Sequence, residues 1–580
     1  MLRKAIAKGL EIFDWWSLRF VRSLIKVVRV FETKQHQPKT PGQLRVATFC
    51  AYVVITLVTC IVLGLMGTLM APHWQIQTNT THIKVQSRNT SIASSLAIPA
   101  HEGTYRIKET PIEVRLTSKV TIRALIREPI GAPENRPACL LIQGAGTGKS
   151  SQVYGDLASS MASAGITTLV PDKRMDDYTI FHRNYVSMAH DYGTSFNILK
   201  HWSGVDENKV GLYAESEGTW ISSIMTAERK DVAFTILTSP PVYSGRQQMA
   251  IAATSYFETA GAPLALTQDI PRLTALNFSV LGLDYADFDS LQYISHLTQP
   301  TLINYGTRDL SMPIEQGATT VISKAKANNN RNVTVRYYDA NHQMRVGDNM
   351  ALPNLPLAVG YTQNLDDWIN GIASGTSAQE WKTPMVAGFQ PHQRYAVPSH
   401  TTAGLVTSLG QLFALMLFGT GLCVIAFLLG LLRSIGRSIR KHGNKGRLLH
   451  SQHSIPVSTN FSRASVASMW ITGLLSIAST LGILGYVIVV VSQALTLQRD
   501  TEFLSSLWIV LRVASIVVIL AFSWLCTQFL NPLLVRLTGR EGNQPDEISH
   551  VFNGLQRIIM LCVLCGSALL MGSLAFWGLY

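Results

Sequence analysis

Five long apolar segments constrain this chain more than any other feature of its sequence. The first lies at residues 46–71, and the other four follow a large polar region, at residues 404–432, 466–495, 507–530 and 558–580. About twenty helical residues cross a hydrocarbon core ~30 Å thick. The pattern therefore predicts one membrane-spanning helix, a large domain outside the bilayer, and an all-α region of four further spans at residues 404–580.

Basic residues predict the orientation of these spans. Ten Lys and Arg residues and three acidic residues precede the first span, and seven basic residues with no acidic residue lie within residues 433–463. Because Lys and Arg accumulate in short cytoplasmic loops, we expect a cytoplasmic N-terminus and an extracytoplasmic polar domain. Residues 1–45 mix basic and apolar positions at near-helical spacing, which predicts an amphipathic segment at the cytoplasmic interface.

The net charge of +13 arises entirely from these two basic segments. Basic residues beside predicted spans favour contact with anionic lipid. We therefore expect the lipid bilayer as a partner and no nucleic acid.

The polar region is expected to hold one domain at residues 106–375, between linkers at residues 72–105 and 376–403. Neither linker has a sustained hydrophobic period, so both are predicted to be tethers. Residues of about 241–297 are predicted to form a helical insertion. Six of the seven cysteines lie in predicted spans and only Cys139 lies in the domain. This usage favours an integral plasma-membrane protein of a bacterial envelope over a disulfide-rich ectodomain.

An isolated serine marks the predicted chemistry of the domain. A strand-like stretch at residues 208–213 runs into Ala214, Ser216 and Gly218. Small residues two positions before and after a serine are typical of a nucleophile elbow, a strained strand-to-helix turn whose backbone passes close to its neighbours. Alanine at position 214 departs mildly from the G-x-S-x-G pattern. Ser216 is the predicted nucleophile.

Asp309 and His342 are the predicted partners of Ser216. Each follows a strand-like apolar stretch, at residues 300–305 and 333–338. The carboxyl ends of parallel strands meet at one edge of a sheet, where doubly wound sheets bind ligands. We expect His342 to accept the Ser216 proton and Asp309 to orient the imidazole.

A glycine-rich turn follows another strand-like stretch at residues 139–142. Backbone amides exposed there could stabilise an oxyanion, an effect worth about a hundred- to a thousandfold in rate for each donor. The predicted donors are the amides of Ala145 and Glu217. The string Gly148-Lys149-Ser150 resembles a phosphate-binding loop, but the required earlier glycine is replaced by Gln143. No nucleotide, metal or other cofactor is therefore expected.

With these residues identified, residues of about 106–375 resemble the α/β-hydrolase family, in its esterase and serine-peptidase branches. The matching stretches are Gln143-Gly144-Ala145-Gly146, where the family usually has His-Gly-x-Gly, Asp172-Lys173-Arg174, and Trp368 in a predicted final helix. The departures are Gln143 and Ala214. The resemblance implies a doubly wound, mostly parallel sheet with a helical lid insertion, and a catalytic triad of Ser216, Asp309 and His342.

Together these features predict a membrane-anchored, extracytoplasmic serine hydrolase. It would cleave or transfer acyl groups of lipid-linked or cell-envelope esters through a covalent acyl-enzyme. Two alternatives stay open: a serine peptidase of the same fold, and a catalytically silent module that binds a protein partner or assists assembly in the membrane. The sequence does not separate water from a hydroxylated acyl acceptor.

Overall fold

A computed structural model describes residues 41–580 except residues 75, 97–99, 147, 351, 353, 400, 444–460 and 538–553. Residues 1–40 of the predicted amphipathic segment lie outside the described residues, and so do residues 444–460 of the basic loop. Residues 58–580 form one compact unit.

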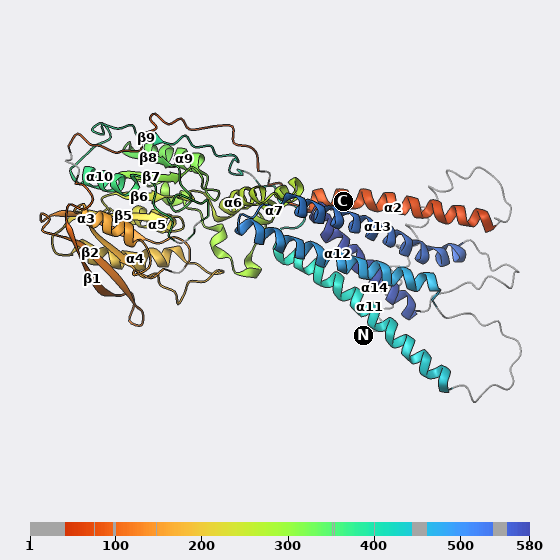
Figure 1. Cartoon of the computed structure of the whole chain (residues 1–580). Coiled ribbons are helices and arrows are strands. Elements are labelled where there is room, and N and C mark those ends of the chain that lie inside the picture. Colours follow the sequence, from red (N-terminus) through yellow and green to blue (C-terminus); the bar gives the residue numbers. More distant parts are fainter. Residues whose placement is uncertain are drawn as a thin grey trace, which may run out of the picture. The chain divides into compact units, whose positions relative to one another are not determined.

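A nine-stranded mixed sheet forms the centre of the polar domain (Figure 1), in the order β1-β2-β4-β3-β5-β6-β7-β8-β9. Strand β2 pairs antiparallel with β1 and β4, whereas the pairs from β3–β4 to β8–β9 are parallel. The parallel strands therefore end at a common edge. The strands are β1 Arg106–Arg115, β2 Thr121–Ile130, β3 Arg136–Ile142, β4 Thr167–Pro171, β5 Val205–Glu215, β6 Thr235–Thr238, β7 Thr301–Gly306, β8 Val333–Tyr338 and β9 Val386–Gly388.

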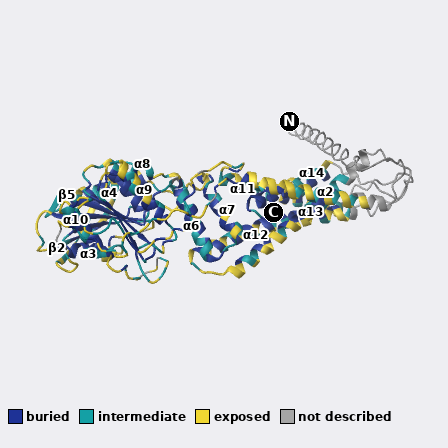
Figure 2. Ribbon diagram, turned by 90° about the horizontal axis from the view of Figure 1, so that it is seen from above, coloured by how far each residue is buried: buried dark blue, intermediate teal, exposed yellow. Residues whose placement is uncertain are grey.

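Helices cover both faces of the sheet. Leu140 and Leu212 point into a core shared with α4 (Tyr185–Lys200) and α5 (Gly218–Glu228), whereas their neighbours Leu141 and Tyr213 point into a core shared with α3 (Gly155–Ser163) and α10 (Tyr361–Ala373). This alternation follows from the two-residue period of a strand. The central strands are accordingly buried (Figure 2), as is usual where helices flank a parallel sheet. Helix α9 (Ile314–Ala327) packs against β7 and β8.

The predicted helical insertion lies between β6 and β7. It contains α6 (Gly245–Ala260), α7 (Leu264–Thr274), two short 3₁₀ turns, η1 (Ser279–Leu281) and η2 (Asp284–Asp287), and α8 (Leu291–Ile294). Phe257 of α6 and Leu266 of α7 belong to a buried apolar cluster that also contains Tyr486, Trp508 and Phe576 of the C-terminal helices. The insertion therefore packs against the apolar helical region.

In the part of the chain that the structure describes, five helices are long and apolar enough to cross a membrane. They are α2 (Pro41–Met70), α11 (Leu409–Gly443), α12 (Arg463–Leu495), α13 (Thr501–Leu537) and α14 (Gly554–Phe576). Large apolar side chains remain exposed on them: Leu417 is 73% exposed, Phe418 70% and Ile488 69%. Such surfaces are unusual in water and suit contact with lipid. The mixed sheet, its helical insertion and these five helices confirm the predicted fold class.

The second apolar helix begins later than the predicted span. Residues 404–408 are not helical, and Leu405 and Val406 donate backbone hydrogen bonds to Leu69 and Met70 at 2.8 and 3.2 Å. A side chain at Gly404 would lie 2.3 Å from the Met70 carbonyl oxygen. Backbone pairing thus delays the start of α11 to Leu409.

The segments predicted as linkers lie against the α/β domain, whereas the sequence analysis predicted tethers. They pair with each other at Thr78 and Tyr395 and at Ser94 and Trp381, and β9 of the sheet lies within the second segment. The buried Arg336 of β8 donates to the carbonyl oxygen of Thr90 at 2.9 Å and to that of Met385 at 3.3 Å. Backbone carbonyls therefore satisfy a buried cation, which a pattern of apolar residues does not reveal.

Candidate active site

Ser216 occupies the tight turn between β5 and α5. Its φ is +52°, in the left-handed region that side chains other than glycine seldom adopt. A Cβ atom at Gly218 would lie 2.7 Å from the Ile142 carbonyl oxygen and 2.8 Å from that of Gln143. The turn therefore needs glycine two residues after the serine, as the elbow pattern predicted.

The structure brings Ser216, His342 and Asp309 together at the carboxyl edge of the sheet. His342, in the loop after β8, has Nε2 2.9 Å from Ser216 Oγ and Nδ1 2.8 Å from Asp309 Oδ2. Asp309 lies in the turn after β7, and its other oxygen accepts a hydrogen bond from the Ser311 N–H at 2.8 Å. An ionised carboxylate only accepts, so Nδ1 donates to it and Nε2 is free to accept the hydroxyl proton.

Charge near the imidazole favours its protonated form. Burial of the ring opposes this, but the Asp309 carboxylate, its hydrogen bond and the neighbouring Glu215 outweigh burial, so the pKa of His342 is raised above its ordinary value. Burial also raises the pKa of Glu215 to about 7, against the opposing charges of His342 and Arg345. Two coupled titrating groups therefore adjoin Ser216.

The glycine-rich turn after β3 approaches the serine closely. A Cβ atom at Gly144 would lie 3.2 Å from Ser216 Cβ. The Gly144 and Gly146 amides donate to the hydroxyls of Tyr154 and Tyr178 at 3.4 and 3.1 Å. Within the described part of the chain, neither the Ala145 nor the Glu217 N–H donates a hydrogen bond. The two predicted oxyanion donors are thus uncommitted, and their role stays a prediction.

The Glu217 side chain has an environment that the sequence analysis missed. The residue is 4% exposed, and its carboxylate accepts hydrogen bonds from four side chains. These are Arg183 at 2.7 Å, Tyr178 at 2.8 Å, Tyr185 at 2.9 Å and Lys173 at 3.4 Å. Among these donors, only Lys173 lies in a stretch that the sequence marked, and nothing in its spacing indicated a partner 44 positions later.

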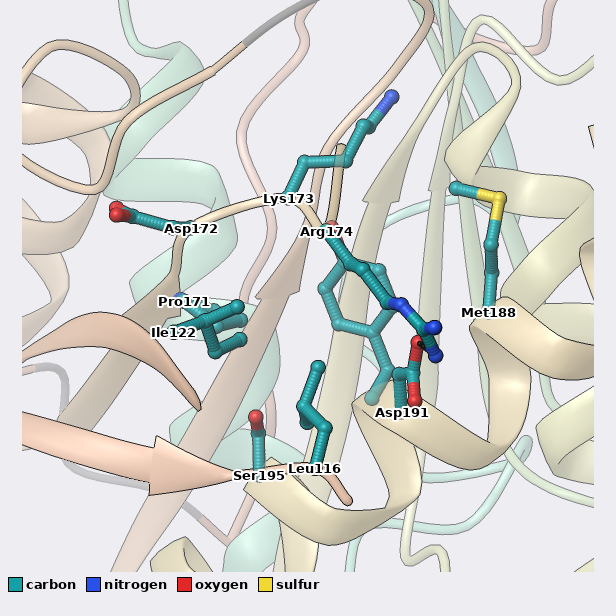
Figure 3. A pocket seen from close by; sticks show the side chains of 10 residues that line it. Leu116, Ile122, Pro171, Asp172, Lys173, Arg174, Met188, Asp191 and Ser195 are labelled. Atoms are coloured by element: carbon teal, nitrogen blue, oxygen red, sulfur yellow. Dashed lines mark hydrogen bonds and ion pairs between the residues drawn. The ribbon is translucent and has the colours of Figure 1, made fainter. Parts of the chain in front are cut away.

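A small cavity lies close to this cluster but does not include the predicted catalytic residues. It has a volume of about 10 Å³, room for about one water molecule. Figure 3 shows Arg174 turned toward Asp191, 3.4 Å away, while the Lys173 side chain points elsewhere. The cavity is therefore too small to be the acyl site, and its lining does not contain Ser216, Asp309 or His342. No group of metal-ligating side chains occurs among the residues that the structure describes.

Among known proteins, this chain is similar to solved structures but not to any family model or curated sequence. No protein-family model matches the sequence, and no curated protein matches it significantly. A Pyrococcus furiosus esterase, Pf2001, is 16% identical over 41% of this chain and 84% of its own, with a TM-score of 0.30. A putative dienelactone hydrolase from Klebsiella pneumoniae is 13% identical over 46% and 98%, with a TM-score of 0.32. A putative dipeptidyl aminopeptidase IV from Bacteroides ovatus is 12% identical over 47% and 36%, with a TM-score of 0.32.

The fold class rests on the chain's own features. These are the mixed sheet flanked by helices, the strained serine turn between a strand and a helix, and the order of Ser216, Asp309 and His342 along the chain. Together they define an α/β-hydrolase fold.

Proposed function

We propose that this chain is a membrane-anchored serine hydrolase whose active site lies outside the cytoplasm and acts on acyl esters. The observation that carries the proposal is the continuous hydrogen-bonded chain from Ser216 through His342 to Asp309, with the serine held at a φ of +52°. Strained backbone of this kind persists only where the surrounding structure enforces it, and it is concentrated at functional sites.

The proposed reaction begins with attack by Ser216 on the substrate carbonyl carbon. His342 Nε2 accepts the hydroxyl proton as the Ser216 Oγ–carbon bond forms, and Asp309 stabilises the resulting imidazolium. The negative charge moves to the carbonyl oxygen, toward the Ala145 and Glu217 amides. The imidazolium then protonates the leaving alkoxide, the carbon–alkoxide bond breaks, and an acyl-serine remains.

Release of the acyl group repeats these steps with a second nucleophile. Water gives its proton to His342 as its oxygen attacks the acyl-serine, and the imidazolium returns a proton to Ser216 Oγ as that bond breaks. The product is a free carboxylic acid. A hydroxylated acceptor in place of water would give a new ester through the same residues.

The proposed substrate class is lipid-linked or envelope esters. The insertion that follows β6 shares a buried apolar cluster with residues of all five apolar helices, and the active-site residues lie in the same domain. This attachment of the domain to the apolar helices favours a substrate that resides in the bilayer. Peptides remain the alternative substrate, because the same residues hydrolyse amides in other folds.

A membrane-impermeant fluorophosphonate probe tests nucleophile and orientation together. We expect the native chain to be labelled on intact cells and Ser216→Ala to be unlabelled. Ser195→Ala, which removes another buried serine hydroxyl, is the matched control and should label normally. Labelling only after permeabilisation would contradict the outward orientation. A well-folded native chain that stays unlabelled in both conditions would favour the silent binding module.

Activity is expected to fall as the solution becomes acidic. General-base catalysis needs a neutral imidazole, and the pKa of His342 is raised above its ordinary value. The labelling rate should therefore fall about tenfold per pH unit below that pKa, with a midpoint above ~6.5. Glu215→Gln should move the midpoint down, because it removes a carboxylate that favours the imidazolium. A rate independent of pH between about 5 and 8 would exclude His342 as the base.

A further inference from the structure

The two predicted oxyanion donors belong to peptide groups whose carbonyl oxygens are both held. The Ala145 N–H shares a peptide plane with the Gly144 carbonyl, and the Glu217 N–H shares one with the Ser216 carbonyl. The described chain contains no cis peptide bond, so each N–H points away from the carbonyl of its own plane. A hydrogen bond that fixes the direction of the carbonyl therefore also fixes the direction of the N–H in the same peptide plane.

The Ser216 carbonyl is fixed within its own turn. It accepts hydrogen bonds from the Thr219 N–H at 2.9 Å and from the Thr219 hydroxyl at 2.7 Å. These bonds come from the first turn of α5, so the direction of the Glu217 N–H follows from local structure. Among the described residues, no neighbour in sequence donates a hydrogen bond to the Gly144 carbonyl.

The Gly144 carbonyl is instead fixed by a distant residue. Lys173, in the loop after β4, donates from Nζ to that oxygen and its backbone N–H donates to the Gly148 carbonyl at 3.2 Å. The preceding residue, Asp172, accepts from both the N–H and the hydroxyl of Ser150 at 2.6 Å. The loop after β4 thus holds the glycine-rich turn along its length.

Glu217 holds the Lys173 side chain in turn. The Lys173 side chain is 1% exposed and lies 3.4 Å from the Glu217 carboxylate. Tyr178 joins the same two elements, since its hydroxyl donates to Glu217 at 2.8 Å and accepts from the Gly146 N–H at 3.1 Å. Glu217 therefore has two parts in the site. Its backbone N–H is one predicted oxyanion donor, and its side chain holds Lys173, which fixes the direction of the other donor, the Ala145 N–H.

We propose that Lys173 is a positioning residue of the oxyanion hole, which aims the Ala145 N–H by binding the Gly144 carbonyl and is itself held by Glu217. This inference rests on the proposed serine chemistry. The ammonium group also polarises the peptide whose carbonyl it binds, which strengthens the Ala145 N–H as a donor. Among the described residues, the side chain of Lys173 donates hydrogen bonds to Gly144 and Glu217 and to none of Ser216, His342 and Asp309, so it acts through the turn.

The test compares fluorophosphonate labelling of Lys173→Met with that of the native full-length chain in membranes. Attack on phosphorus places negative charge in the same hole, so the maximal labelling rate should fall about ten- to a hundredfold. The probe concentration for half-maximal rate should stay unchanged, because no probe-binding group is removed. The midpoint of the pH profile should stay unchanged as well, because His342 and Asp309 are untouched.

Two further variants keep the inference falsifiable. Arg174→Met is the matched control: it removes the adjacent cation, which pairs with Asp176 and Asp191, and should label at the native rate. Tyr178→Phe should slow labelling in the same direction as Lys173→Met, which covers the case in which Lys173→Met does not fold. Native rates in both Lys173→Met and Tyr178→Phe, equal slowing in Arg174→Met, or a displaced pH midpoint in Lys173→Met would overturn the inference. If the native chain itself is unlabelled, the proposed function falls and this inference falls with it.

Discussion

Asp309→Asn is expected to lower the maximal labelling rate about 10⁴-fold while the protein stays folded. Asp309 Oδ2 lies 2.8 Å from His342 Nδ1, where an amide nitrogen would present a hydrogen in place of a lone pair. The imidazole would then place its proton on Nε2, facing Ser216, and could not accept the hydroxyl proton. Loss of the carboxylate also leaves the imidazolium without its counter-charge.

The matched control for this prediction is Asp339→Asn. Asp339 precedes His342 by three residues and pairs with Arg308 at 2.6 Å, but both side chains of this pair are more than 40% exposed. Exposed pairs contribute about 0–1 kcal/mol, so this variant should label at nearly the native rate. Near-native labelling of Asp309→Asn, or an equal loss in Asp339→Asn, would show that Asp309 does not orient the base. Circular dichroism of both purified variants checks that the fold is retained.

The site was predictable where its residues sit in local patterns. Ser216, Asp309 and His342 each follow a buried strand, and parallel strands bring their carboxyl ends to one edge. The three residues could therefore be predicted to lie close together although they are far apart in the sequence, because the loops that contain them follow parallel strands of one sheet. The helical insertion and the five apolar helices were predictable for a related reason, since length and hydropathy alone specify them.

The features that the sequence did not predict, strand β9 and the surroundings of Glu217, depend on contacts between distant segments. Strand β9 has three residues, Val386–Gly388, too few to show a period, and it pairs with β8 next to the Met385 carbonyl that Arg336 binds. The donors to Glu217 come from residues 173–185: Lys173, Tyr178 and Arg183 lie in the loop between β4 and α4, and Tyr185 is the first residue of α4. Charged residues in loops are normally solvated, so sequence alone favours exposed side chains at these positions.

Glu217→Ala is expected to destabilise the α/β domain by about 3–5 kcal/mol. The substitution leaves two buried or half-buried cations without their carboxylate, since Arg183 lies 2.7 Å and Lys173 3.4 Å from Glu217, and their side chains are 15% and 1% exposed. Removal of one partner from such a buried group costs more than the pair contributes, because the desolvated charge is left unpaired. Asp206→Ala, which breaks a pair with Lys209 on the surface, should cost less than about 1 kcal/mol.

The pH dependence of this loss identifies its cause. Burial lowers the pKa of Lys173, and Glu217 opposes that lowering, so Glu217→Ala should lower the pKa further. Between the lowered pKa of Lys173 in the folded variant and the ordinary lysine pKa in the unfolded chain, the unfolded chain binds one more proton than the folded chain. The stability of Glu217→Ala therefore rises with pH across this window. We therefore expect the difference in thermal inactivation midpoint between Glu217→Ala and the native chain to be largest at neutral pH and to shrink toward alkaline pH. A difference that is constant with pH would attribute the loss to packing and not to the unpaired ammonium. A midpoint equal to the native one would show that water replaces the carboxylate at no cost.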